Sequence, residues 1–153
     1  MSPLDGYGHG THVAGLIGGD KAEAKGVAPG VSYVSLRVLN NSGMGTTSHV
    51  INALQWAVTK KTTYGIDVIN LSLGAPVLQS YRDDPLGEAA ARAVKAGITV
   101  VAAAGNFGQT PDGKSIFGGV TSPANHPAVI AVGALDTRGT ALRSDDRIAK
   151  FSS

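Results

Sequence analysis

The histidines near the start of the chain are the first side chains that could carry out acid–base chemistry. They lie in residues 5–15, where glycines flank His9 and a run of small apolar residues follows. An imidazole accepts and releases a proton near neutral pH, which makes histidine the most common general base in enzymes. Because the apolar run suits a helix that begins near Thr11, the sequence predicts a reactive histidine at a helix start.

Three later segments also carry residues that suit a site, and each follows an apolar stretch. They are Asn-Asn-Ser-Gly-Met-Gly at residues 40–45, Asn-Leu-Ser-Leu-Gly at 70–74 and Ala-Ala-Ala-Gly-Asn at 102–106. In open α/β sheets, functional residues gather in the loops beyond the carboxyl ends of the strands. We therefore expect the three segments to meet at one edge of a sheet.

The elements that must position these segments alternate between strands and helices. Stretches rich in β-branched and apolar residues predict strands at 31–39, 66–71, 98–104 and 128–133, the last two of them buried. Apolar residues at helical spacing, behind a Thr-Thr-Ser cluster, predict a helix from Thr46 to about Lys61. An alanine-rich helix over 85–96 begins near Asp83 and Asp84 and ends at Gly97. Glycine, proline and asparagine then predict a long surface loop over 107–127.

Strands that alternate with helices predict an α/β fold of three layers, in which helices cover both faces of a mostly parallel sheet. The length of 153 residues fits one domain, and an apolar content of 42% can supply its core. The 21 glycines indicate many tight turns and close backbone approaches. Such a composition suits a shallow cleft that is lined by main chain.

Charge and cysteine content exclude several classes of function. The formal charge of +2 comes from 13 basic and 11 acidic residues without a long run of either sign, so no nucleic-acid or membrane surface is indicated. Cysteine is absent, which excludes a disulfide framework and a thiolate nucleophile. No apolar stretch approaches the roughly 18 residues that span a bilayer. Residues 1–5 lack the charged and apolar regions of a signal peptide.

The pattern Gly-His-Gly-Thr-His-Val-Ala-Gly, with the three later segments in order behind it, resembles the subtilisin-like serine proteases, or subtilases. The resemblance implies that His9 is the general base of a Ser-His-Asp triad. Subtilase triads run Asp, His, Ser along the chain, so an aspartate-bearing strand should precede His9 and a Gly-Thr-Ser-Met-Ala-like segment should follow. The 153 residues contain neither. We therefore interpret residues 1–153 as a partial subtilisin-like peptidase domain, incomplete at both ends.

The resemblance also implies a cleft for a peptide or protein substrate. In subtilases an extended substrate lies between two main-chain segments, matched here by a first rail of Gly43, Met44 and Gly45 and a second rail of Ser72, Leu73 and Gly74. Backbone hydrogen bonds would give affinity and side-chain pockets would give specificity. The pocket for the residue before the scissile bond would have a wall of Ala103, Ala104 and Gly105. Such small walls leave room for a large apolar side chain.

Asn106 matches the asparagine of the family whose side-chain amide donates to the oxyanion of the tetrahedral intermediate. In subtilisin, where this effect has been measured, loss of that donor lowers turnover about 10²–10³-fold. The second donor in the family is the backbone N–H of the nucleophilic serine, which this sequence does not contain. The resemblance therefore implies half of an oxyanion hole.

Other interpretations of the histidines and glycines fail on spacing. A metal site at His9 and His12 lacks a third ligand at a useful distance along the chain. A dinucleotide loop lacks the third glycine of Gly-x-Gly-x-x-Gly, because Val13 occupies that place. Only one histidine of the pair can face a cleft well, so we expect His12 to pack within the helix.

Two further residues invite a catalytic interpretation that their context does not support. Ser72 lacks the Gly-x-Ser-x-Gly elbow of a nucleophile, so substrate-rail or turn chemistry is the better interpretation. Asp5 lies four residues before His9, whereas the triad aspartate of the family comes from a separate upstream strand. We therefore expect Asp5 to form a turn or a local hydrogen bond.

Residues 16–25 depart from the family pattern in a way that bears on cofactors. They lack the asparagine-containing loop that binds calcium in the best-known subtilisins, and two acidic residues interleaved with two lysines replace it poorly. The sequence therefore predicts no cofactor: calcium stays possible in the full-length protein, but these residues do not support it. The family resemblance implies an extracellular location.

Three interpretations of the whole chain stay open. It is a piece of a serine endopeptidase, a non-catalytic pseudoprotease that holds peptides, or a truncated gene product. In subtilases the aspartate-bearing strand lies between the strands that resemble 31–39 and 66–71. Because this chain lacks that strand, we expect an incomplete sheet that can self-associate.

Overall fold

The structure is a computed structural model that describes residues 4–153. The first three residues of the segment 1–5, which was compared with a signal peptide, lie outside the described residues. At its centre is a parallel sheet in the order β3 (Val68–Leu71), β4 (Thr99–Ala103) and β5 (Ile130–Val132). In the register, Ile69 pairs with Val100 and Ala102 pairs with Ala131. The predicted strands at 66–71, 98–104 and 128–133 are thus confirmed in kind, and each is shorter than predicted.

Both predicted helices form, and local capping signals explain their bounds. In α2 (Thr47–Tyr64) the side chain of Thr46 accepts a hydrogen bond from the backbone N–H of His49, and Gly65 ends the helix in the left-handed conformation with φ of 62°. In α3 (Pro85–Lys95) Asp84 caps the N-terminus at a position followed by proline. Within residues 4–153, no helix is both long and apolar enough to cross a bilayer.

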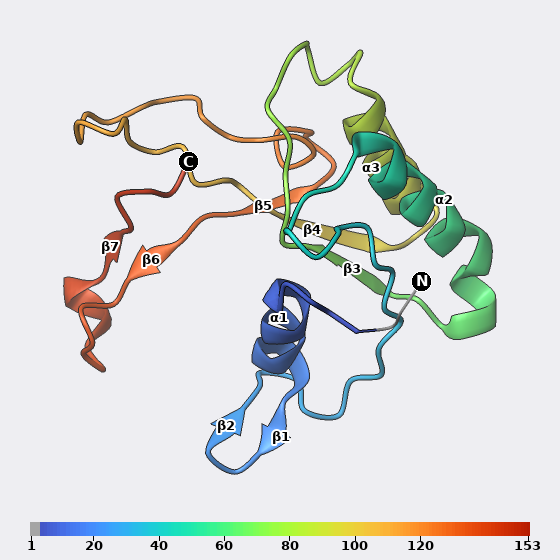
Figure 1. The fold of residues 1–153 in the computed structure, drawn as a ribbon, viewed down its shortest axis with the longest axis horizontal. Helices are drawn as coiled ribbons and strands as arrows, with labels where there is room; N and C mark the ends of the chain where they lie inside the picture. The colour runs from blue at the N-terminus through green and yellow to red at the C-terminus, as the bar shows by residue number, and fades with distance from the viewer. Residues whose placement is uncertain (1–3) are drawn as a thin grey trace.

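The core lies between these two helices and one face of the sheet. Figure 1 shows α2 and α3 side by side along that face, and the two helices contact each other. Leu54 of α2, Leu86 of α3 and Val100 of β4 are all nearly fully buried. Burial of one such leucine stabilises the fold by about 1.5–3 kcal/mol. The small alanines of α3 let its backbone approach the sheet closely.

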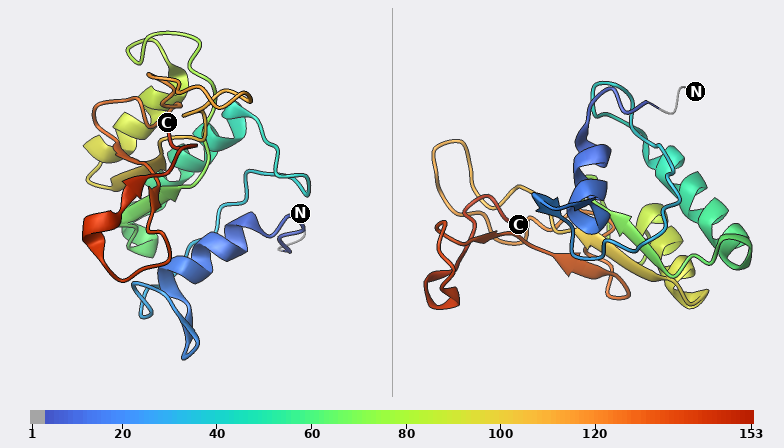
Figure 2. Two further views of the ribbon diagram at one scale, coloured as in Figure 1. Left: turned by 90° about the vertical axis from the view of Figure 1, so that its left-hand side faces the viewer. Right: turned by 90° about the horizontal axis from the view of Figure 1, so that it is seen from below.

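A third helix, α1 (His9–Gly18), lies on the opposite side of the sheet from α2 and α3 (Figures 1 and 2). The expected α/β fold with a parallel sheet between helices is therefore confirmed. However, no residue of α1 is buried. The helix layer on this side is thus open to solvent, whereas the layer of α2 and α3 is packed.

Two short antiparallel hairpins were not predicted. One pairs β1 (Asp20–Lys21) with β2 (Ala24–Lys25), and the other pairs β6 (Leu135–Asp136) with β7 (Arg147–Ile148), with a short 3-10 helix η1 (Arg143–Asp145) between them. Strands of two residues are too short to show an alternating pattern, so the sequence carries no periodic signal for them.

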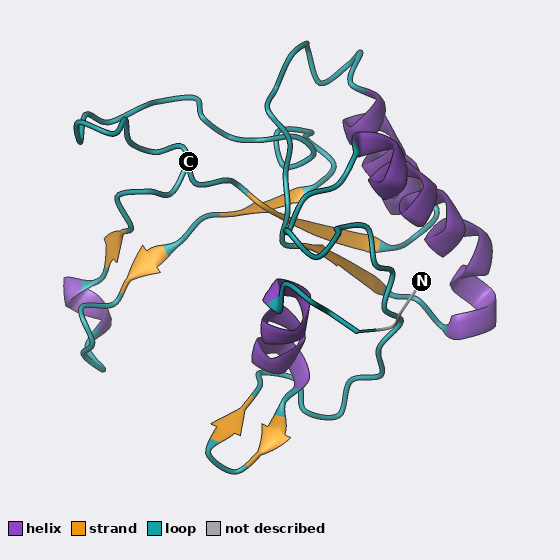
Figure 3. Ribbon diagram, viewed as in Figure 1, coloured by secondary structure: helices purple, strands orange, loops and turns teal. Residues whose placement is uncertain are grey.

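The predicted strand at 31–39 is wrong. The segment has no regular secondary structure except at Leu39, which forms an isolated antiparallel bridge with Gly45, and Figure 3 draws it as loop. Its β-branched residues suit a strand, but a strand also needs a neighbour to complete its hydrogen-bond ladder. Within residues 4–153 no strand of the sheet pairs with this segment.

Two predictions of burial also need correction. All three residues of β5 are exposed, including Ile130 at 53%, because β5 is the edge of the sheet and no described helix packs on it. The loop over 107–127 contains no helix or strand, as predicted. Its residues 121–124, however, are buried rather than at the surface.

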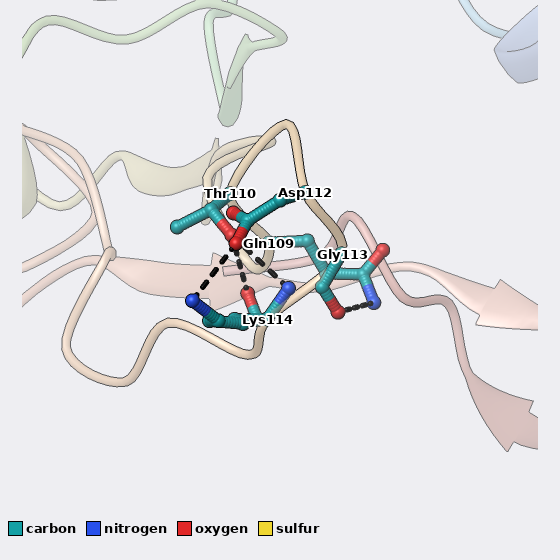
Figure 4. Close-up of polar contacts among 5 residues, drawn as sticks. All are labelled: Gln109, Thr110, Asp112, Gly113 and Lys114. Atoms are coloured by element: carbon teal, nitrogen blue, oxygen red, sulfur yellow. Dashed lines mark hydrogen bonds and ion pairs between the residues drawn. The ribbon is translucent and has the colours of Figure 1, made fainter.

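The exposed part of this loop folds onto itself, as Figure 4 shows. The backbone N–H of Lys114 donates to the hydroxyl of Thr110 at 3.0 Å, and the Lys114 ammonium pairs with Asp112 at 3.0 Å. Hydrogen bonds from the side chains of Thr110 and Lys114 lower the pKa of Asp112. The turn is closed by its own residues, whereas residues 121 and 122 later in the loop bond the segments that follow β4 and β3.

Candidate active site

The carboxyl ends of β3 and β4 bring the second rail and the pocket wall side by side. Residues 121 and 122 bridge them: Ala75 and Ser122 exchange two backbone hydrogen bonds of 2.9 and 3.0 Å, and the N–H of Thr121 donates to the carbonyl of Ala104 at 2.8 Å. The expectation that strand-end segments meet at one edge of the sheet is met by these two segments.

Thr121 is a residue of this site that sequence reasoning missed. Its side chain is almost fully buried, with 4% exposed, and its hydroxyl lies 3.3 Å from the carbonyl of Ala103 and 3.2 Å from that of Ala104. The loop composition of its neighbours predicted a surface position. No local signal marks it, because it is buried by contacts with segments far away in the sequence.

His9 is the first residue of α1, two positions earlier than the predicted start of the helix. Gly8 precedes it in the left-handed conformation, with φ of 86°, which a glycine adopts without strain. The helix start is held by Asp5, whose carboxylate accepts hydrogen bonds from the backbone N–H of Gly8 and of Thr11, both at 2.8 Å. The predicted local role of Asp5 is therefore confirmed.

The same contacts set the charge of Asp5. The backbone N–H of Thr11, then that of Gly8, then the hydroxyl of Thr11 donate to the carboxylate and lower the pKa of Asp5 to about 2. An anion at this place also interacts favourably with the positive end of the helix. The carboxylate thus stays ionised and fixes the backbone just before and after His9.

The imidazole of His9 reaches the second rail. Its Nε2 atom lies 2.9 Å from the carbonyl oxygen of Ser72. This hydrogen bond joins α1 to the end of β3 across 63 positions of sequence. The structure therefore brings the predicted base and the predicted rail into direct contact.

The first rail lies in a loop that Asn40 closes. The side-chain oxygen of Asn40 accepts from the backbone N–H of Ser42 at 2.9 Å and of Met44 at 3.1 Å. Gly43 has a positive φ of 72°, and a Cβ atom there would lie 2.5 Å from the ring of Tyr7. Because Tyr7 comes two residues before His9, this close packing places the first rail beside the start of α1.

Asn106 lies beyond the end of β4 with its side chain exposed. The C-terminal Ser153 holds the backbone on both sides of it: its N–H donates to the carbonyl of Gly105 at 3.1 Å, and its hydroxyl accepts from the N–H of Phe107 at 2.9 Å. Within the described residues the amide of Asn106 forms no hydrogen bond. Its donors are thus open to a ligand.

The alternative assignments can also be placed. The hydroxyl of Ser72 accepts a hydrogen bond from the Asn70 amide at 2.9 Å. His12 is exposed, so the expectation that it packs within the helix is wrong for this chain, because α1 has no buried face. In the described part of the chain, no group of three or more His, Cys, Asp or Glu side chains could hold a metal ion.

The predicted base, His9, and the predicted amide donor, Asn106, are both exposed, but the predicted base lacks the partners of a triad among the described residues. Among residues 4–153, neither a carboxylate nor a serine hydroxyl forms a hydrogen bond with His9. A triad needs both, one to orient the imidazole and one to give up its proton. Within residues 4–153, His9 therefore has neither of the two partners that a triad base needs.

Comparison with known proteins agrees with this geometry. Residues 2–153 match the model of the Subtilase family. Subtilisin DY of Bacillus licheniformis is 44% identical over 135 residues, which are 87% of this chain and 45% of that protein. The serine protease AprX of Bacillus subtilis (strain 168) is 38% identical over 160 residues, covering 99% of this chain and 35% of that protein.

The fold agrees as well. The structure of sphericase superposes with a TM-score of 0.77 at 32% identity, covering 94% of this chain and 44% of that one. The S41 psychrophilic protease superposes with a TM-score of 0.76 at 31% identity over the same shares. The chain spans less than half the length of each of these relatives. The family match over nearly the whole sequence and the shared fold show that the chain belongs to the subtilase family of serine proteases.

Proposed function

We propose that residues 1–153 form part of the catalytic domain of a serine endopeptidase, which hydrolyses peptide bonds by a Ser-His-Asp mechanism in the complete protein. The observation that carries the proposal is the contact between His9 and Ser72, because it sets a histidine from one side of the sheet against a main-chain rail at the strand ends. In this proposal His9 is the general base and Asn106 is the oxyanion donor. The carbonyl oxygen of the scissile bond would lie within reach of the exposed Asn106 amide.

The substrate would bind as an added strand between the two rails. Leu73 and Gly74 support this role, because their main-chain groups form no hydrogen bonds with the described part of the chain. Gly45 of the first rail is exposed as well. Open main-chain donors and acceptors are what an extended peptide needs for strand addition. The pocket wall of Ala103, Ala104 and Gly105 would contact the side chain before the scissile bond.

This role in binding can be tested on the 153-residue chain by NMR titration with extended peptides. We expect weak binding, with chemical-shift changes centred on residues 43–45 and 72–74. Chemical-shift changes centred on other residues would contradict the proposed cleft. So would the absence of any binding at millimolar peptide concentration.

The 153-residue chain alone is expected to show no measurable peptide hydrolysis. Its sequence has no segment that resembles Gly-Thr-Ser-Met-Ala. In subtilisin, where the effect has been measured, loss of the serine alone lowers turnover about as much as loss of the whole triad, by roughly 2 × 10⁶-fold. Turnover of a chromogenic peptide that survives repurification and disappears in His9→Ala would overturn this expectation.

A second candidate is a pseudoprotease that binds peptides in the same cleft without cutting them. The absence of a carboxylate or serine hydroxyl beside His9 among the described residues favours this candidate for the chain alone. The coding DNA separates the two candidates. If it continues beyond Ser153 into Arg-Gly-Pro and later Gly-Thr-Ser-Met-Ala, the endopeptidase is supported; a stop codon directly after Ser153 supports the pseudoprotease or a truncated product. We further propose an extracellular location, which the family membership supports.

A further inference from the structure

The segment that leads into α1, residues 4–8, lies against the loop over residues 39–45 that carries the first rail. A Cβ atom added to Gly6 would lie 2.7 Å from the side-chain Cγ of Asn41. Tyr7, the next residue, packs against the first rail in the same way. Because these contacts follow one another in the same order along both segments, the two segments run side by side.

The side chain of Arg37 joins these two segments through hydrogen bonds. Its guanidinium donates to the carbonyl of Leu4 at 2.8 Å, to the amide oxygen of Asn41 at 2.5 Å and to the carbonyl of Leu39 at 3.0 Å. The planar guanidinium holds its donors in a fixed arrangement, so one side chain can fix three acceptors relative to one another. Arg37 thus connects the chain before His9 to the loop of the first rail.

Further bonds extend this connection towards the proposed base and towards the first rail. The carboxylate of Asp5 accepts hydrogen bonds from backbone N–H groups on both sides of His9. In the loop, the N–H of Asn40 donates to the carbonyl of Met44 at 2.7 Å. Asp5 and Asn40 each follow directly a residue whose carbonyl accepts from Arg37. The guanidinium therefore lies between the bonds that fix His9 and those that fix the first rail.

The surroundings of Arg37 indicate that these bonds set the position of the loop more than they stabilise the fold. Arg37 is exposed, so its donors compete with water and contribute little to the free energy of unfolding. Its segment, 31–39, forms no strand with the described residues, so no ladder of main-chain bonds fixes this stretch to the sheet. The side-chain bonds of Arg37 supply part of that missing constraint.

We infer that Arg37 is a positioning residue that holds the first rail in a fixed place relative to His9, so that an extended peptide can bond both rails at once. The inference rests on the proposed function, because it uses the proposed cleft. A loop that is already held in its binding conformation binds more tightly, since no free energy is spent on ordering it. Loss of the Arg37 bonds should therefore weaken binding at the first rail, while the second rail keeps its contact with His9.

The experiment titrates acetyl-Ala-Ala-Ala-Phe-amide into the 153-residue chain and into R37Q. NMR reports the dissociation constant and the shift changes at each rail. In R37Q we expect the dissociation constant to rise about tenfold, and the shift changes at residues 43–45 to fall relative to those at 72–74. A residue that only stabilised the fold would change the folded fraction and leave this ratio unaltered in the folded molecules.

A second measurement needs no peptide. In the unmodified chain the ring of Tyr7 should show nuclear Overhauser contacts with Gly43, because the two residues pack together. In R37Q these contacts should weaken, since the two segments lose the bonds that join them. Unchanged contacts in R37Q would contradict the positioning role directly.

Two further variants separate hydrogen-bond geometry from charge. R37K keeps the positive charge, but an ammonium group is a point charge that cannot reproduce the fork of three bonds. Its dissociation constant should lie between those of the unmodified chain and R37Q. R147Q is the matched control, because it removes the same charge from β7, where the Arg147 side chain forms no hydrogen bond with the described residues. It should bind the peptide as the unmodified chain does.

The outcomes distinguish this inference from the proposed function. If the unmodified chain binds the peptide at both rails and folded R37Q binds it equally well with the same ratio of shift changes, the role of Arg37 is wrong and the cleft stands. If neither R37Q nor R37K folds, Arg37 stabilises the whole chain and the inference is wrong. If the unmodified chain binds the peptide at neither rail, the proposed cleft fails and the inference fails with it.

Discussion

The Nε2 atom of His9 lies 2.9 Å from the carbonyl oxygen of Ser72. A carbonyl oxygen only accepts hydrogen bonds, so Nε2 carries a proton, and in a neutral imidazole the free lone pair is then on Nδ1. A triad base needs the opposite arrangement, with Nδ1–H held by the acid and the lone pair of Nε2 facing the nucleophile. The contact thus explains the orientation of the imidazole ring in a chain where no described carboxylate bonds Nδ1.

We therefore expect the neutral form of His9 in this chain to be the Nε2–H tautomer. Long-range ¹H–¹⁵N correlation spectra at alkaline pH can show which ring nitrogen carries the proton. The exposed His12 serves as an internal control and should show no such fixed tautomer. A dominant Nδ1–H form of His9 would mean that the bond to Ser72 is not formed in solution.

Asp5 should give the chain a measurable acid dependence. Its folded pKa of about 2 lies below the ordinary aspartate value of about 3.9, so its ionised form favours the folded state. This contribution is fully present above the ordinary pKa and disappears as pH falls through about 2. Carboxyl ¹³C titration should give a pKa near 2, and unfolding measured between pH 4 and 2 should depend less on pH in Asp5→Asn.

Asp20→Asn is the matched control, because it removes an exposed carboxylate that forms no hydrogen bond with the described chain. In that variant the carboxyl group of Asp5 should still titrate near pH 2. An ordinary titration of Asp5, near pH 4, would show that the start of α1 is not held as described.

The parts of the fold that the sequence predicts are those with local signals. Two helices begin or end at signals that span only a few residues. These signals are the cap at Thr46, the Asp84 cap before Pro85, and Gly97 in the left-handed conformation. The strands β3, β4 and β5 were recognisable from short apolar runs between turn residues. The candidate site was found through the order of its motifs along the chain, which does not depend on knowing any contact.

What could not be predicted depends on contacts between residues that are distant in sequence, or on pairing that no described residue supplies. Residues 31–39 have strand-like side chains but no described strand beside them, and β5 is exposed because nothing described covers it. Thr121 has the sequence context of a loop residue, but it packs against Gly74 and Gly105, one of which is distant in sequence and one of which follows β4. His12 was expected to pack within a helix whose packing surface is open here.

Asp84 should be one of the most sensitive polar residues to substitution. Its carboxylate caps α3 at Leu86 and also accepts the hydroxyl of Ser122, which is 3% exposed. Loss of an N-cap costs about 0.5–2 kcal/mol, and a buried hydroxyl left without a partner costs about 1–3 kcal/mol. Asp84→Ala should therefore lower the free energy of unfolding by about 1.5–5 kcal/mol in urea titrations.

The neighbouring Asp83 offers the control, since its side chain caps no helix. Asp83→Ala should change the free energy of unfolding by less than about 0.5 kcal/mol, as surface substitutions usually do. Equal effects of the two substitutions would show that the Asp84 contacts do not stabilise the chain.

The sheet itself leads to the last prediction, which concerns association. β3 and β5 are both edges, and Val68 and Ile130 on them are 60% and 53% exposed. Unpaired edge strands with exposed apolar side chains are templates for pairing with another chain. Solvent reaches these edges, so their free main-chain groups bond water. We therefore expect the open sheet to lower the stability of the chain and to favour its association. We expect concentration-dependent self-association in sedimentation experiments.

Val68→Lys should weaken that association, because a charge on an edge strand opposes pairing between copies. Val27→Lys makes the same change at an apolar residue that is 90% exposed but outside the sheet, and it should have no such effect. A peptide with the sequence of the aspartate-bearing strand of a relative should raise the stability of the chain, since it would pair with the open edge of β3. A monomer that unfolds cooperatively above about 60 °C at every concentration, in the upper part of the range for mesophile domains, would show instead that this short sheet is stable without further strands.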